Sequence, residues 1–213
     1  MALSKVNYNS LNVTPTASKF LMWDSDADAL QASDVGGNLK LLSTQTASDS
    51  SSLSITSGID STYKEYIFEF INIHPATNSQ HFQVNFRDGS SAFDATKTTT
   101  SFYAYQDEAG SSTDLTYLTG LDLAQSTAYQ SICGTVGNGN DESFSGTMHL
   151  FDPSNTTFVK HFMVRGNTYS QDDLSADMYF AGYCNVTAAI DGVDFKFASG
   201  NIDSGVVKMY GVL

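Results

Sequence analysis

The stretch HFQVNF, residues 81–86, decides the fold class because its apolar and polar side chains alternate strictly. Phe82, Val84 and Phe86 fall on one side of an extended chain, while Gln83 and Asn85 fall on the other. A two-residue period of this kind predicts a β-strand with one buried face and one solvated face.

Strands of this type are predicted along the whole chain from residue 39 onward. Turn dipeptides such as Asp88-Gly89 and Asp191-Gly192 separate them, and no window of a dozen residues carries a helical apolar stripe. The pattern predicts an all-β domain at 39–213, an antiparallel and jelly-roll-like β-sandwich, with a closed barrel as the lesser alternative. The expected strands are 39–44, 52–56, 64–73, 81–86, 100–105, 144–151, 157–164, 176–184, 193–198 and 205–213, with a weaker region at 115–133.

Two segments with a similar pattern support the jelly-roll interpretation. FINIHPATNSQHFQV (70–84) and HLFDPSNTTFVKHFMV (149–164) each contain an apolar strand, a short loop with a proline, and a second strand carrying His-Phe. Proline presets a turn and donates no ladder hydrogen bond. We interpret both segments as β-hairpins with loops of about four to six residues.

Residues 1–38 differ from the remainder of the chain and are predicted to form an extended N-terminal arm. They contain Pro15, a Gly36-Gly37 break and an acidic run, but no sustained period. The segment FLMW (20–23) is too apolar for a free tail and needs a cover, either the body of this chain or a neighbour. The arm is expected to attach the protein to a particle or another partner.

Composition and charge exclude several classes of function. The formal net charge is −13, which disfavours binding to nucleic acid. No stretch of 18 apolar residues exists, so no membrane insertion is expected, and the first residues do not resemble a secretory signal. We therefore expect synthesis in a cytoplasm. Cys133 and Cys184 are too few for a disulfide framework and are predicted to be free and packed.

Candidate catalytic residues do not form a recognisable pattern. His149, Asp152 and Ser154 could form a nucleophilic triad, but Ser154 has no G-x-S-x-G elbow around it. A glycosidase needs two facing carboxylates, and nothing singles out a pair. The acidic candidates include Glu65, Glu69, Glu108 and Glu142, of which Glu69 stands inside an otherwise apolar strand.

Candidate metal ligands are equally weak. The pairs His74 with His81 and His149 with His161 could ligate a metal across a hairpin, but their spacing is not diagnostic. The segment DSDAD (24–28) begins like a calcium loop, although Ala29 stands where the sharp turn requires glycine. We predict no catalytic, cofactor-binding or metal-binding residues, while a weak surface calcium site near Asp24–Asp28 stays open.

Aromatic side chains offer a binding alternative. Tyrosine combines a large apolar face with a polar tip and could stack on sugars. Exposed Tyr, Asn and Asp around 105–118 or 165–175 are the expected contacts for a glycan. The tyrosines of interest are Tyr103, Tyr105, Tyr117, Tyr129, Tyr169, Tyr179 and Tyr183.

Three stretches resemble virion structural proteins of tailed bacteriophages, in particular those of marine phages. They are SKVNYNSLNVTP (4–15), GIDSTYKEYIFEFINIHP (58–75) and SGNIDSGVVKMYG (199–211). The resemblance implies a particle component that forms a homo-oligomer, with a trimer favoured, and that contributes no enzymatic residues. It also implies location in the virion.

Two functions of this class fit an N-terminal arm joined to a β-sandwich. The favoured function is a tail fibre or tail-associated protein, held to other virion proteins by residues 1–38 and contacting a host-surface glycan. The alternative is a capsid decoration or head-fibre protein. A glycan-binding or polysaccharide-depolymerising module of another origin is the further alternative.

Overall fold

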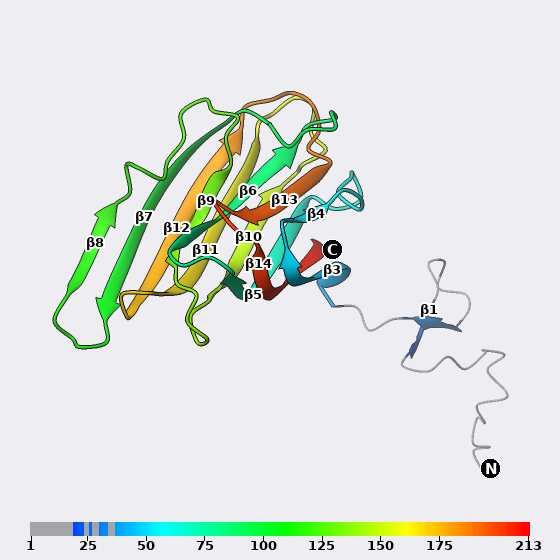
Figure 1. Ribbon diagram of the computed structural model, residues 1–213. Helices are drawn as coiled ribbons and strands as arrows, with labels where there is room; N and C mark the ends of the chain where they lie inside the picture. Colours follow the sequence, from blue (N-terminus) through cyan, green and yellow to red (C-terminus); the bar gives the residue numbers. More distant parts are fainter. Residues whose placement is uncertain (1–18, 24–25, 27–29, 34–36) are drawn as a thin grey trace, which may run out of the picture. The chain divides into compact units, whose positions relative to one another are not determined.

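The computed structural model describes residues 19–23, 26, 30–33 and 37–213 (Figure 1). The chain divides into two compact units, Met1–Asn38 and Leu39–Leu213. In the first unit, strands β1 (Phe20–Trp23) and β2 (Leu30–Ser33) pair antiparallel.

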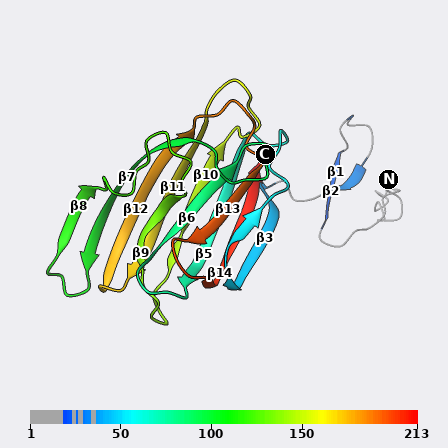
Figure 2. The ribbon, with the colours of Figure 1, turned by 45° about the horizontal axis from the view of Figure 1, so that its top comes forward.

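The second unit is built from two antiparallel sheets that pack face to face. Figures 1 and 2 show the smaller sheet lying over one face of the larger one, while β7 and β8 extend beyond it. The larger sheet contains, in spatial order, β3 (Leu39–Ser50), β14 (Ile202–Val212), β5 (Glu65–Pro75), β10 (Phe144–Phe151), β11 (Lys160–Ser170), β12 (Leu174–Cys184), β7 (Lys97–Asp107) and β8 (Thr113–Tyr117). The smaller sheet contains β4 (Leu53–Ile55), β13 (Gly192–Phe197), β6 (Gln80–Arg87) and β9 (Gln130–Val136).

This arrangement confirms the predicted all-β fold and its antiparallel sandwich. Within residues 37–213 no helix occurs. The jelly-roll connectivity and the extended character of the arm stay predictions.

Phenylalanine rings from both sheets fill the space between them. The alternation that begins at Phe82 places Phe82, Val84 and Phe86 in the interior. The Phe82 ring stacks on Phe195 at 5.9 Å, and Phe70 of the larger sheet meets Phe195 edge-on at 5.2 Å. Each buried Phe contributes about 2–3 kcal/mol of transfer free energy, and paired rings add about 0.5–1.5 kcal/mol.

Of the two predicted hairpins, one is confirmed and one is wrong. β10 and β11 pair directly, and residues 152–159 connect them, which is a longer loop than expected. β5 and β6 instead lie in different sheets, so residues 76–79 carry the chain from one sheet to the other. The two segments share a local pattern, but that pattern does not specify which sheet receives the second strand.

Candidate functional site

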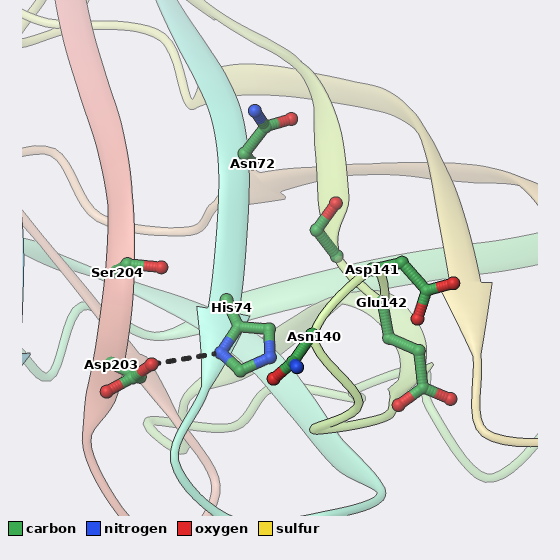
Figure 3. Close-up of a pocket in the computed structure, with 8 residues that line it drawn as sticks. Asn72, His74, Asn140, Asp141, Glu142, Asp203 and Ser204 are labelled. Atoms are coloured by element: carbon green, nitrogen blue, oxygen red, sulfur yellow. Dashed lines mark ion pairs between the residues drawn. The ribbon is translucent and has the colours of Figure 1, made fainter.

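The first candidate is an acidic recess where β5 and β14 meet the loop before β10. It has a volume of about 470 Å³. His74 lies in it, with Nε2 3.0 Å from the carbonyl oxygen of Gly139 and Nδ1 3.3 Å from a carboxylate oxygen of Asp203. In Figure 3 the carboxylates of Asp141 and Glu142 point away from this imidazole. The acidic groups therefore do not converge, and among the described residues no cluster of three or more His, Cys, Asp or Glu could hold a metal ion.

The second candidate is a groove on the outer face of the larger sheet, the face that the smaller sheet does not cover. Two adjoining hollows of about 480 and 420 Å³ share a floor made by Met163, Ala181 and Thr100. These three residues are register partners on β11, β12 and β7. We call this feature the outer groove.

The walls of the outer groove are cross-strand aromatic pairs. On one side Phe102 and Tyr179 stack at 4.7 Å with nearly parallel rings, and the Arg165 guanidinium lies 5.0 Å from the centre of the Tyr179 ring. On the other side His161 meets Tyr183 at 6.1 Å. These stacking and cation–π contacts order the aromatic side chains that line the outer groove.

The third candidate is a smaller cavity lined by residues of β7, β9, β11 and β12, close to the turn that joins the end of β11 to the start of β12. Its volume is about 250 Å³, and we call it the end cavity. Thr168 on β11 lines it with only 1% of its surface exposed, and the Thr168 hydroxyl has no hydrogen-bond partner. The apolar part of the lining comes from Tyr103, Leu118, Leu121, Leu174, Ala176 and Met178.

A fully buried row of Lys97, Cys184 and Lys160 closes the opposite end of the same strands. The three residues are register partners on β7, β12 and β11. Lys97 donates a hydrogen bond to the Ala128 carbonyl at 2.7 Å, and Lys160 donates one to the Val186 carbonyl at 2.6 Å. Burial lowers the pKa of Lys97 to about 8 and raises the pKa of the Cys184 thiol to about 12. Both lysines donate hydrogen bonds to loop carbonyls, and this structural role accounts for their burial.

The structure does not assemble the triad of His149, Asp152 and Ser154. His149 Nδ1 lies 2.6 Å from a carboxylate oxygen of Glu65. The Asp152 carboxylate accepts a hydrogen bond from Lys64 at 2.8 Å, and contact with Lys64 is the main cause of its lowered pKa.

The histidine pairs are also separated. His74 belongs to the larger sheet and His81 to the smaller one. His149 and His161 both face outward, but His149 is opposite Met163 rather than His161. In the segment 24–28 only Asp26 is described, so the calcium hypothesis lies outside the described residues.

The candidate carboxylates are dispersed. Glu69 has the expected outward position, with its side chain 40% exposed, 3.7 Å from Lys208 and accepting a hydrogen bond from Tyr210. Glu142 accepts the backbone N–H of Gly139.

The candidate tyrosines divide between two faces. Tyr103 and Tyr105 stack at 5.4 Å on the inner side of the larger sheet, where Tyr103 lines the end cavity. Tyr179 and Tyr183 line the outer groove instead. The two loop regions expected to contact a glycan, 105–118 and 165–175, lie side by side, since the Glu108 N–H donates to the Asp173 carbonyl at 3.0 Å.

Sequence reasoning missed Thr168 and Lys97 as unusual residues. The sequence did contain a signal for both residues. Each has a polar side chain at a position where the two-residue period of its strand predicts a buried side chain. Thr168 follows Phe162 and Val164 at even spacing along β11, and Lys97 opens β7 at an inward position. A polar residue in such a position is a buried polar group that needs a partner.

No protein-family model matches this sequence, and no curated protein matches it significantly. Among the described residues no helix is long and apolar enough to cross a membrane. The proposals below therefore rest on the residues themselves.

Proposed function

We propose that the chain is a non-enzymatic structural protein of a tailed-bacteriophage virion, assembled as a homo-oligomer with a trimer favoured. Of the two locations, a tail fibre or tail-associated position is preferred to a capsid decoration or head-fibre position. The resemblance of the three sequence stretches supports the class, and a β-sandwich with an attached N-terminal segment is compatible with it.

The observation that carries this proposal is the apolar character of the uncovered sheet face. Phe102, Leu115, Tyr117 and Met163 all point outward from the larger sheet and are 42–70% exposed. Monomeric proteins rarely expose contiguous apolar patches of this kind, and such patches usually mark a contact surface. Sister copies that covered this face would remove its aromatic area from water.

A second apolar surface supports attachment through residues 1–38. All four residues of β1, Phe20, Leu21, Met22 and Trp23, are 45–62% exposed in the first unit. A short strand with four large apolar side chains in water is costly, because each would release about 1.5–3 kcal/mol on full burial. Another virion protein is the proposed cover.

The proposal is tested with a deletion of residues 1–38 and with the full-length variant Met163→Glu. The deletion should leave a folded body that no longer joins particles, because the anchor is gone. Met163→Glu should weaken self-association measured by light scattering, because a carboxylate would be buried at the contact. Full occupancy of particles by the deleted protein would refute the anchoring role. Unchanged association of Met163→Glu would refute contact through the outer face.

Polysaccharide depolymerisation is the competing function, and turnover separates it from the structural one. The purified protein should release no reducing ends from capsular or cell-wall polysaccharides. If it does release them and the change Glu65→Gln or Glu142→Gln abolishes the turnover, the structural proposal is wrong.

A further inference from the structure

The loop between β9 and β10 contains the one Asn-Gly pair of the sequence, Asn138-Gly139. An asparagine before a glycine is chemically labile in water, because the next backbone nitrogen can attack the side-chain amide and glycine has no Cβ to obstruct that approach. Asn138 is exposed, so water reaches it. Whether the reaction proceeds in the folded protein depends on the groups around Gly139.

The surroundings of Gly139 fix its position and place a base on its N–H. The Gly139 carbonyl accepts two hydrogen bonds at 3.0 Å, one from Nε2 of His74 and one from the backbone N–H of Glu142. The Glu142 side chain turns back over the loop, and its carboxylate accepts the N–H of Gly139. A Cβ at Gly137 or Gly139 would overlap this carboxylate, so the two glycines allow it to come this close.

Glu142 is therefore positioned as a general base for the attacking nitrogen. The hydrogen of Gly139 lies in the plane of its peptide group and points at Glu142, while the electrons that attack Asn138 lie above and below that plane. Proton removal and attack are thus geometrically compatible. General acid–base catalysis by a positioned side chain typically accelerates a reaction by about 10²- to 10⁴-fold.

We propose that Asn138 is a self-modification site, at which Glu142 promotes loss of the side-chain amide group. The Gly139 nitrogen attacks Cγ of Asn138, while Glu142 takes the proton of the Gly139 N–H and passes it to the amino group, which leaves as ammonia. The five-membered succinimide that remains takes up one water molecule and opens to aspartate or isoaspartate. The reaction consumes only solvent water and needs no oxidant or reductant. This inference goes beyond the proposed virion role and does not depend on it.

The modification would also weaken the contact between this loop and residues 76–79, which carry the chain from one sheet to the other. The Asn138 side chain donates to the Ala76 carbonyl at 3.5 Å, and the Asn138 backbone N–H donates to Oδ1 of Asn78 at 3.2 Å. A carboxylate in place of the amide cannot donate to Ala76. It also adds negative charge next to the acidic recess, where like charges repel. The loop should therefore loosen once Asn138 is converted.

The test follows conversion of Asn138 in the purified full-length protein at near-neutral pH. Peptide mapping by mass spectrometry measures the converted fraction, and incubation in H₂¹⁸O marks the oxygen that enters when the succinimide opens. The folded protein should convert Asn138 at least about tenfold faster than the same protein unfolded in urea, because only the folded chain holds Glu142 on the Gly139 N–H. Asn78, which is exposed and precedes a serine, is the internal reference and should show no such acceleration.

Variants then separate the basicity of Glu142 from its structural contact. Glu142→Gln keeps an oxygen that can accept the Gly139 N–H but removes the base, so conversion should slow at least about tenfold. Its rate should also rise more steeply with pH than the wild-type rate, because hydroxide must then act as the base. Asp141→Asn removes one carboxylate of the same turn and keeps Glu142, so this matched control should convert like the wild type. Asn138→Asp imitates the product and should melt at a lower temperature than freshly purified wild type.

Two results would overturn the inference: conversion that is no faster in the folded protein than in urea, or an equal rate in Glu142→Gln and the wild type. An unchanged melting temperature of Asn138→Asp would refute the loosening of the loop. The virion proposal is judged separately, by the association of the protein with particles.

Discussion

Replacement of Lys97 by methionine should change how the stability of this protein depends on pH. Lys97 is fully buried at the start of β7, and its ammonium group donates to the Ala128 carbonyl. Burial is the main reason that its pKa falls from 10.5 to about 8, against smaller opposing effects of Cys184 and Asp94. Methionine is similar in length and cannot titrate, so Lys97→Met removes the charge and keeps most of the packing.

The size of the effect follows from the pKa shift. Between pH 8 and 10.5 the unfolded chain keeps its proton on Lys97 and the folded chain does not, so the free energy of unfolding rises with pH. One pKa unit corresponds to about 1.4 kcal/mol, and the full shift therefore corresponds to about 3 kcal/mol. Near pH 7 Lys97→Met no longer requires a charged ammonium group to be buried, which favours the folded state of the variant. The variant also leaves the Ala128 carbonyl without its hydrogen-bond donor, at a cost of about 1–3 kcal/mol. The two effects nearly cancel there.

The measurement is urea unfolding of wild type and variant from pH 7 to 10, both in a Cys184→Ser background. That background removes a thiol whose pKa responds to Lys97. From pH 8 to 10 the free energy of unfolding of the wild type should rise by about 2 kcal/mol relative to that of Lys97→Met, because the group is half titrated in the folded protein at pH 8 and already partly titrated in the unfolded chain at pH 10. Lys40→Met, at an exposed position of β3, is the control for the loss of a lysine as such. If the difference in free energy of unfolding between wild type and Lys97→Met stays constant from pH 8 to 10, the reasoning is refuted.

Phe82→Ala should lower the free energy of unfolding by about 3–5 kcal/mol in urea titrations, because Phe82 is fully buried between rings of both sheets; a loss under 1 kcal/mol would contradict the described core. Tyr129→Phe should cost about 1–3 kcal/mol, since the Tyr129 hydroxyl donates to the buried carboxylate of Asp194 at 2.8 Å; Asp194→Asn in the same background should recover part of that loss. Cys133 and Cys184 are free and buried, and burial raises both thiol pKa values to about 12. Reductant should leave the melting temperature unchanged, and both thiols should react with iodoacetamide only after unfolding.

Much of the fold could be predicted because apolar alternation is a local property. The strand at 144–151 was predicted with the bounds of β10, and the interior positions Phe82, Val84 and Phe86 follow from their period alone. The prediction that both cysteines are free and packed is confirmed. These successes share one reason: the period of side chains along a strand does not depend on the neighbouring strands.

The candidate site could be predicted only in part. The regions 105–118 and 165–175 were singled out from exposed tyrosine and acidic residues, but nothing in the sequence indicated that the Glu108 and Asp173 backbones meet. The hairpin at 70–84 was wrong because a loop with proline can join strands of one sheet or of two. Tyr103 and Tyr179 look alike in the sequence, yet one lines an interior cavity and the other an open groove.

The sequence by itself determined that the chain forms β-strands and which side chains of each strand share a face. Only the tertiary structure decided which of those faces is covered, since that depends on the order of strands in two sheets of unequal width. A threonine is therefore ordinary at Thr100, which faces outward, whereas the hydroxyl of Thr168 is buried between the sheets without a hydrogen-bond partner. Pairing across long sequence separations created that difference, and local periodicity carries no information about it.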